Sequence, residues 1–162
     1  MSYRFFAVIP PGLEAVLEKE LRQHIPNPVA AKLKIETGGV SFSVSLEDGI
    51  FLLEKLRTPA KVLLRLGTKK LRRMKDVEQL FNSSSLKILL PQKTSFAIEI
   101  HTQHSTLRGD VLKSKCKRIL KALFQDSAEN IHTLQLRVQN NLGTLSLQIN
   151  DGPLYKRGWR SK

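Results

Sequence analysis

Cysteine is almost missing from this 162-residue sequence, because Cys116 is the single one. A lone thiol forms no internal disulfide and cannot build a zinc site from paired thiolates. This cysteine usage is what a reducing compartment permits. The sequence therefore excludes the disulfide-rich secreted class and the common zinc-binding modules.

Long apolar runs are also missing, and no stretch reaches the length needed to span a membrane. The N-terminus carries one early arginine, Arg4, and soon reaches Pro10, Pro11 and Gly12. That leaves too little room for the apolar core of a signal peptide. We therefore expect a soluble, cytoplasmic protein with no membrane partner.

Motifs for catalysis and cofactor binding are missing as well. The sequence has no Gly-rich phosphate loop, no Gly-x-Gly-x-x-Gly after a strand and no nucleophile elbow. His101 and His104 are three residues apart without a third ligand beside them, which favours a surface pair over a metal site. Cys116 falls on the apolar side of an expected helix, which favours a buried structural cysteine, although basic neighbours would lower the pKa of an accessible thiol. We expect no catalytic residue, metal or cofactor in this chain.

Acidic residues are scarce relative to basic ones. Lys and Arg number 27 against 14 Asp and Glu, for a net charge of +13 and a pI near 10.2. Hydrophobic residues make up 41% of the chain, which is enough to fold, so the excess charge sits on a globular body. Such a charge balance indicates a phosphate-rich partner, with nucleic acid as the first candidate.

The basic residues gather in three clusters along the chain. Each phosphate that they neutralise would release condensed counterions, which supplies most sequence-independent affinity. The alternative is a set of solvated faces that only aid solubility. In the tail, Tyr155 and Trp159 alternate with basic residues, where they offer flat groups for an unpaired base or pack the tail onto the domain. The expected RNA-binding residues are Lys69, Lys70, Arg72 and Arg73 in the first cluster, Arg108, Lys113, Lys115, Lys117, Arg118 and Lys121 in the second, and Lys156, Arg157 and Arg160 in the tail.

Hydrophobic periodicity in the first 70 residues predicts the order strand, helix, strand, strand, helix, strand. This order is typical of a ferredoxin-like subdomain, with two helices on one face of an antiparallel sheet. In the second helix we expect Ile50, Leu53 and Leu56 to face the core. The expected strands are residues 3–9, 32–35, 40–44 and 62–66, and the expected helices are residues 13–24 and 46–56.

The hydrophobic pattern of residues 71–162 predicts a second α/β subdomain. A helix over residues 76–81 and a loop over 83–85 precede a strand over residues 96–102. Asp110 stands where an N-cap belongs, before a helix over residues 111–123 whose apolar side holds Leu112, Cys116 and Leu120. Asn140, Asn141 and Gly143 then separate two alternating strands, residues 134–138 and 144–149, as in a hairpin. The fold class expected for the whole chain is mixed α/β.

Four motifs in this order resemble a known family. That family is the THUMP domain with its preceding ferredoxin-like domain, as found in RNA methyltransferases that modify guanine in tRNA or ribosomal RNA. The resemblance spans nearly the whole chain. Its motifs are Phe5-Phe6-Ala7-Val8 leading to Pro11-Gly12-Leu13-Glu14, Gly38-Gly39-Val40-Ser41-Phe42, Leu56-Arg57-Thr58-Pro59-Ala60-Lys61-Val62-Leu63 and Gly152-Pro153-Leu154-Tyr155-Lys156-Arg157-Gly158-Trp159-Arg160.

The resemblance implies that residues 71–162 form a THUMP subdomain that recognises RNA. In tRNA enzymes of the family this domain holds the acceptor end for a fused catalytic domain. By similarity, the helix with Lys113, Lys117 and Arg118 and the loop over residues 105–108 would face RNA, and the tail would lie at the junction with the catalytic domain. The sequence departs from the family pattern, because it contains no methyltransferase domain, no S-adenosylmethionine site and no Asn-Pro-Pro-Tyr-type motif.

Three functions remain open from the sequence. The first is a THUMP-type module that grips structured RNA, tRNA or rRNA, for a reaction carried out by a separate or missing catalytic domain. Its partners would be RNA and a methyltransferase or other RNA-modifying enzyme. The second is a part of an S-adenosylmethionine-dependent RNA methyltransferase. The third is a ribosome-associated or protein-interaction domain without direct catalysis.

Overall fold

A computed structural model describes residues 1–156, which form two compact units. The first unit joins Met1–Leu64 to the segment that begins at Gln148, and the second unit is Arg65–Leu147. The sequence-based boundary after residue 70 therefore differs from the division in the structure in two places. The first unit ends earlier than expected, and residues 148–156 return to it instead of completing the second.

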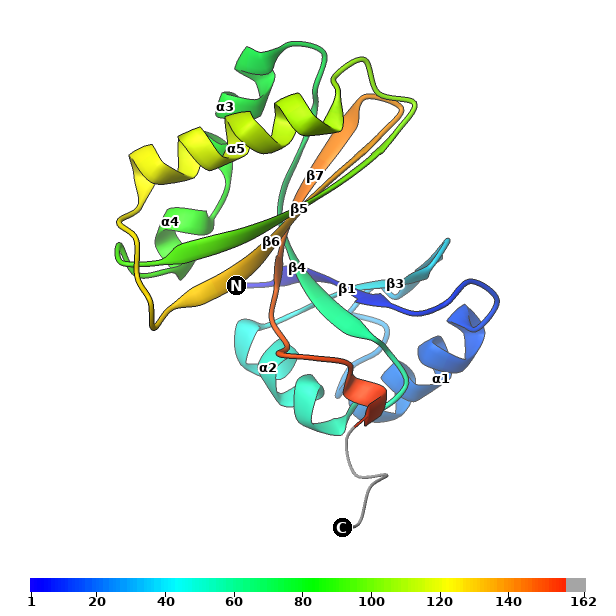
Figure 1. Ribbon diagram of the computed structural model, residues 1–162. Helices are drawn as coiled ribbons and strands as arrows, with labels where there is room; N and C mark the ends of the chain where they lie inside the picture. Colours follow the sequence, from blue (N-terminus) through cyan, green and yellow to red (C-terminus); the bar gives the residue numbers. More distant parts are fainter. Residues whose placement is uncertain (157–162) are drawn as a thin grey trace. The chain divides into compact units, whose positions relative to one another are not determined.

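The first unit has the strand and helix order expected for a ferredoxin-like domain. Its strands follow the order β2-β3-β1-β4, and β3 pairs antiparallel with both β2 and β1. Helices α1 and α2 lie on one face of this sheet (Figure 1). The elements are β1 (Tyr3–Val8), α1 (Glu14–His24), β2 (Lys34–Glu36), β3 (Gly39–Val44), α2 (Leu46–Lys55) and β4 (Lys61–Lys70), of which the last continues into the second unit.

Two glutamates of α1 hold the loops around it. The carboxylate of Glu14 accepts hydrogen bonds from the backbone N–H groups of Gly38 (3.0 Å) and Gly12 (2.7 Å). These bonds favour the ionised carboxylate and so lower the pKa of Glu14, and the bond from Gly38 has the largest effect. The carboxylate of Glu20 accepts from the N–H groups of Arg57 (2.8 Å) and Thr58 (3.1 Å), which ties the connection before β4 to the helix.

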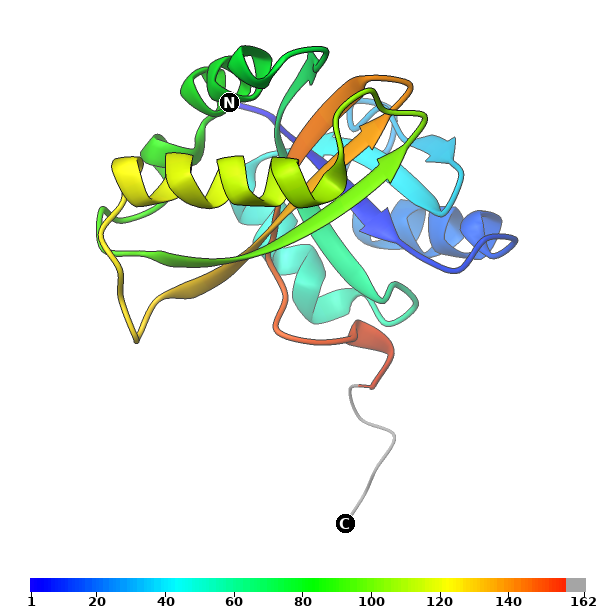
Figure 2. The same ribbon diagram turned by 45° about the horizontal axis from the view of Figure 1, so that its top comes forward.

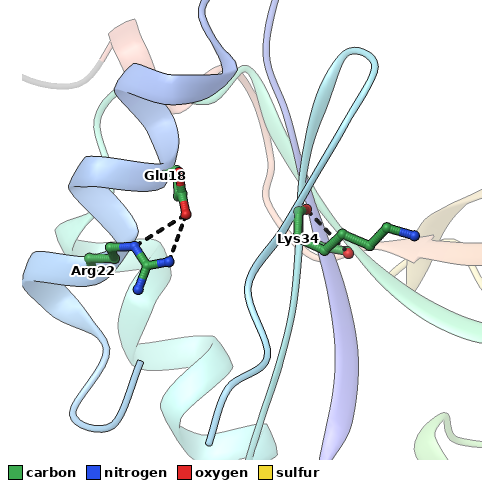
Figure 3. Close-up of polar contacts among 4 residues, drawn as sticks. Glu18, Arg22 and Lys34 are labelled. Atoms are coloured by element: carbon green, nitrogen blue, oxygen red, sulfur yellow. Dashed lines mark hydrogen bonds and ion pairs between the residues drawn. The ribbon is translucent and has the colours of Figure 1, made fainter. Parts of the chain in front are cut away.

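Other charged side chains of this unit remain on the surface. Arg22 donates two hydrogen bonds to Glu18, one turn earlier on α1 (2.7 and 3.2 Å). Lys34 on β2 is exposed, and its side chain points away from α1 (Figure 3). An exposed i,i+4 pair of this kind adds only a few tenths of a kcal/mol, about 0.3–0.5.

The core-facing side of α2 differs in part from the expected one, although Leu56 at its C-cap is buried as expected. Gly49 and Leu52 are buried, whereas Ile50 is 53% exposed, so the expectation for Ile50 is wrong. The reason is the aromatic pair under the helix, in which the rings of Phe5 and Phe42 stack at 5.5 Å. A Cβ at Gly49 would lie 2.2 Å from the Phe5 ring, so only glycine permits this close approach. Periodicity locates apolar side chains, but it does not reveal a glycine on the buried face.

The returning segment is fastened to β4 by one buried side chain. The carboxamide oxygen of Asn150 accepts a hydrogen bond from the N–H of Val62 (2.7 Å), and its nitrogen donates to the carbonyl oxygens of Gly152 (2.5 Å) and Ala60 (3.4 Å). The N–H of Ile149 also donates to the carbonyl of Val62 (3.1 Å). Asn150 is buried, so these bonds replace its hydration entirely. The short 3-10 helix η1 (Leu154–Lys156) then buries Leu154 in the same unit.

The second unit covers one face of a sheet with helices. Its strands follow the order β4-β7-β6-β5, where β5 pairs parallel with β6 and β6 pairs antiparallel with β7. Helix α5 connects the two parallel strands and runs beside β5 (Figure 2). The elements are α3 (Met74–Ser83), α4 (Leu86–Leu89), β5 (Ser95–Gln103), α5 (Gly109–Leu123), β6 (Ile131–Gln139) and β7 (Leu142–Gln148).

Several expectations for the second unit are confirmed and others are corrected. The hairpin is present, with positive φ angles at Asn140 (50°) and Asn141 (61°), as a two-residue turn of this kind requires. The cap of α5 is different: Arg108 is its N-cap, and Asp110 lies in the first turn. The helix expected over residues 76–81 is longer, and after the connection at residues 84–85 it is followed by α4, for which the sequence analysis made no prediction. Helix α4 has only four residues, which is too short to show a helical period in the sequence, although its Leu86 is buried.

None of the helices within residues 1–156 combines the length and the apolar character needed to cross a membrane.

Cys116 lies on the buried side of α5 with Leu112 and Leu120. Burial raises the pKa of its thiol from 9.0 to about 12, because the thiolate would lose its hydration. The expectation of a buried cysteine is confirmed, and the basic neighbours on the helix do not activate it.

We predict that Cys116 does not react with a thiol reagent such as 5,5′-dithiobis(2-nitrobenzoate) at pH 8 until the protein is unfolded. Because the pKa of the thiol is raised in the folded state, its contribution to stability is complete below pH 9 and is lost as the pH rises toward 12. Reaction in native buffer at the rate of the urea-unfolded protein would contradict this burial.

Substitution of Gly49→Ala should destabilise the first unit by about 1–3 kcal/mol, the usual range for an overpacked core. The new methyl group meets the Phe5 ring, and this clash exceeds the gain in helix propensity of about 1 kcal/mol. The matched control is Gly109→Ala, also in a helix, where the nearest atom would lie 3.8 Å away. Urea titrations should show a loss for Gly49→Ala and no loss for Gly109→Ala.

Removal of the Asn150 carboxamide should also weaken the first unit. Asn150→Ala leaves the buried N–H of Val62 without its acceptor, at a cost of about 1–3 kcal/mol. Asn82→Ala on the exposed surface of α3 is the control and should change the free energy of unfolding by less than about 0.5 kcal/mol. Equal denaturation midpoints for the two variants would show that Asn150 does not hold the returning segment.

Candidate nucleic-acid interface

Helix α5 presents a line of lysines on its exposed side. Lys113, Lys117 and Lys121 are four residues apart, so they stand one above another along the helix. All three are exposed, as is Arg118 on the neighbouring side. Within residues 1–156 none of these four cations forms an ion pair. We call Lys113, Lys117 and Lys121 the α5 stripe.

The α5 stripe borders a groove between α5 and the edge strand β5. This groove has a volume of about 240 Å³ and is open to solvent. Its floor includes the rings of Phe96 and Phe124, which meet edge to face at 5.0 Å. Lys117 and Lys121 form its basic wall. A phosphate chain beside α5 would therefore meet several cations and little competing negative charge, apart from Asp126 at one end.

Two of the expected basic residues on α5 and its loop are already paired. The ammonium group of Lys115 contacts the carboxylate of Glu78 on α3 and lowers the pKa of that carboxyl through a hydrogen bond and charge attraction. Arg108 contacts Asp110 at 3.0 Å on the surface. The structure thus brings Lys113, Lys117 and Lys121 together and places Lys115 on the side of the helix that faces α3.

A second basic surface lies where β4 leads into α3. Lys69, Lys70 and Arg72 line an open hollow of about 360 Å³. Asp76 shapes this turn, because its carboxylate accepts hydrogen bonds from the N–H groups of Arg73 (2.9 Å) and Arg72 (3.0 Å). These bonds lower the pKa of Asp76, and the bond from the N–H of Arg73 has the largest effect. The turn therefore fixes the backbone and leaves the side chains of Arg72 and Arg73 exposed.

The tail cluster is only partly described. Lys156 is exposed in η1, which belongs to the first unit. Tyr155 is half-exposed, and the side chain that anchors η1 is Leu154. Arg157, Trp159 and Arg160 lie outside the described residues.

The sequence-based interpretation missed a polar hollow on β5 and β6. Its volume is about 410 Å³, and its lining includes His101, Gln103, Gln135 and Arg137. The signal was present, because polar residues alternate with apolar ones along both strands. What the sequence does not show is the parallel register, which sets His101 opposite Arg137.

The two histidines do not form a metal site with their neighbours. The imidazole Nε2 of His101 lies 3.8 Å from the carboxylate of Glu99, and His104 follows the end of β5 with a positive φ of 50°. In the described part of the chain, no three His, Cys, Asp or Glu side chains come close enough to hold a metal ion.

The fold of the chain resembles several larger enzymes of known structure. It superposes on a predicted N6-adenine-specific DNA methylase from Listeria monocytogenes with a TM-score of 0.84 and 21% identity, over 99% of this chain and 43% of that one. The values for TrmN from Thermus thermophilus are a TM-score of 0.66 and 17% identity, over 97% and 48%. For a 4-thiouridine synthetase solved with RNA and ATP, the TM-score is 0.56 and the identity 13%, over 91% of this chain and 41% of that one.

The chain thus spans less than half the length of each of these three proteins. At such low identities the likeness concerns the fold. No curated protein sequence matches the chain.

A family model supplies the more specific match. Residues 4–63 match the RlmL ferredoxin-like domain, which coincides with the first unit from β1 to the beginning of β4. The order and pairing of the strands in this segment are those of a ferredoxin-like sheet. Residues 4–63 are therefore similar to the RlmL ferredoxin-like domain family.

Proposed function

We propose that this chain is an RNA-binding module of THUMP type that holds structured RNA, tRNA or rRNA, for a modification reaction. The observation that carries this proposal is the α5 stripe, a line of exposed and unpaired lysines beside an open groove in the second unit. Three aligned cations complement the negative charge of a phosphate chain, and each phosphate that they neutralise releases condensed counterions. Lys156, Arg157 and Arg160 remain additional candidates.

The similar structures support RNA as the partner. One of them, a 4-thiouridine synthetase, was solved as a complex with RNA, and its fold matches 91% of this chain. An A-form RNA helix hides its deep groove from side chains, so its backbone and shape are what a basic helix contacts. The binding should therefore depend strongly on salt and weakly on sequence.

A methyltransferase is the favoured enzyme partner. Proteins described as methylases or methyltransferases recur among the similar structures, one of them complexed with SAH. In each of these the part similar to this chain is less than half of the protein. The second candidate function follows directly: the chain is the substrate-gripping part of an S-adenosylmethionine-dependent methyltransferase. The chemistry would then reside in a separate part of that enzyme.

The first test is the binding of labelled tRNA to the 162-residue chain over a series of salt concentrations. The triple variant Lys113→Glu, Lys117→Glu, Lys121→Glu should bind at least about tenfold more weakly. The slope of log K against log salt should fall by about one for each phosphate that the variant no longer neutralises. The same titration with tRNA that lacks its single-stranded acceptor end shows whether that end is held.

The matched control makes the same change of charge in the first unit, with Lys19→Glu, Lys32→Glu and Lys34→Glu, all at exposed positions. It should retain most of the wild-type affinity and slope. Equal weakening by both triple variants would mean that affinity depends only on the total charge of the chain. That result would refute the α5 stripe as the binding surface. A DNA duplex of equal length serves as competitor, and preference for the duplex would refute RNA as the substrate.

A further inference from the structure

The polar hollow on β5 and β6 lies on the face of the sheet that the helices leave open. Thr102 lies next to Gly109 of α5, since a Cβ on that glycine would be 3.8 Å from the threonine hydroxyl. Side chains alternate between the two faces of a strand, so His101 and Gln103 point to the opposite face. The parallel register places Arg137 beside His101 and Gln135 beside Glu99. These residues all belong to the second unit.

Gln135 carries a hydrogen-bond acceptor that no described residue satisfies. Its side-chain oxygen is buried and has no hydrogen-bond partner in the part of the chain that the structure describes. A buried polar atom in this state costs about 1–3 kcal/mol. The same residue lines the hollow, so a ligand with an N–H or O–H group could supply the missing donor.

The charges around the hollow are balanced, unlike those of the α5 stripe. Arg137 is exposed and makes one long hydrogen bond to Gln139 (3.4 Å). The carboxylate of Glu99 lies 3.8 Å from the His101 imidazole, so one negative charge stands on the same face of the strands as the positive charge of Arg137. A site with little net charge attracts a phosphate weakly, so its specificity comes from hydrogen bonds and from the flat imidazole ring.

The size of the hollow also restricts the ligand. Its volume of about 410 Å³ falls within the range of small-molecule sites, roughly 300–1,000 Å³. The lining is mostly polar and open to solvent, which does not suit an apolar ligand. A nucleotide has the required features: a flat base, amino and hydroxyl donors, and carbonyl acceptors for a guanidinium group.

We propose that this hollow holds one unpaired nucleotide of the bound RNA and selects among the bases. The base lies against His101, and an amino or ribose hydroxyl group donates to the side-chain oxygen of Gln135. Arg137 donates to an acceptor on the base edge. This inference rests on the proposed function and adds a site for selection to a surface that supplies affinity, since phosphate contacts position a nucleic acid and base contacts specify it.

The test compares the binding of short, end-labelled oligomers of A, C and U to the 162-residue chain by fluorescence anisotropy. The wild-type protein should prefer one homopolymer over another by roughly tenfold, the effect of one good base contact of 1–3 kcal/mol. Gln135→Met removes the acceptor at similar volume, and it should bring the affinities within about twofold of one another. Its salt dependence should stay that of the wild type, because no charge is changed.

Gln23→Met on exposed α1 is the matched control and should keep the wild-type preference. A second measurement adds each ribonucleoside 5′-monophosphate and follows backbone amide signals by NMR. Shifts should concentrate at residues 101–103 and 135–138. Thermal unfolding of each variant shows that a change in binding is not a loss of fold.

The possible failures are distinguishable. Wild-type binding that does not discriminate among the oligomers, or a Gln135→Met variant that discriminates as well as the wild type, overturns the nucleotide site and leaves the RNA-binding proposal intact. Nucleotide-induced shifts confined to α5 would also overturn it. No binding of any RNA overturns both proposals together.

Discussion

The return of the C-terminal segment to the first unit depends on the hydrogen bonds of the Asn150 carboxamide. The carboxamide satisfies the N–H of Val62 at the beginning of β4 and binds two backbone carbonyls, so it holds a segment from the far end of the chain in the first unit. The whole second unit, Arg65–Leu147, is therefore inserted between two parts of the first. The carboxamide both donates and accepts at these positions, which neither the ionised carboxylate of Asp nor the side chain of Leu can do.

This insertion explains which parts of the fold were predictable. The ferredoxin-like order, the hairpin at Asn140 and the buried side of α5 follow from local periodicity and turn chemistry, and the sequence shows both. The domain boundary depends on contacts between residues 88 positions apart, such as Asn150 and Val62, and no local pattern records them. The expectation that Ile50 faces the core was wrong for a related reason, since the position of Gly49 against Phe5 follows from packing and not from hydrophobicity.

The basic surface was predictable to the same extent. The i,i+4 spacing of Lys113, Lys117 and Lys121 is visible in the sequence and becomes a stripe once the helix forms. The pairing of Lys115 with Glu78 is not visible, because it depends on how α3 packs against α5. A count of basic residues in the sequence is therefore larger than the number of cations that are free to bind a ligand. The structure separates those that hold two helices together from those that remain available to a ligand.

The polar hollow shows how a parallel strand pair can create a site that a list of charged residues misses. Glu99 and Gln135 are opposite one another, and so are His101 and Arg137, only because α5 carries the chain back so that β5 and β6 run in the same direction. The α5 stripe and the hollow thus have one structural origin, the β5-α5-β6 crossover. Its helix exposes lysines that form no ion pair within residues 1–156, and the open face of its strands carries the unsatisfied acceptor of Gln135 beside side chains of both charge signs. A ligand that is both highly charged and rich in hydrogen-bond donors would complement both surfaces, and for this reason we propose RNA as the partner and not an acidic protein.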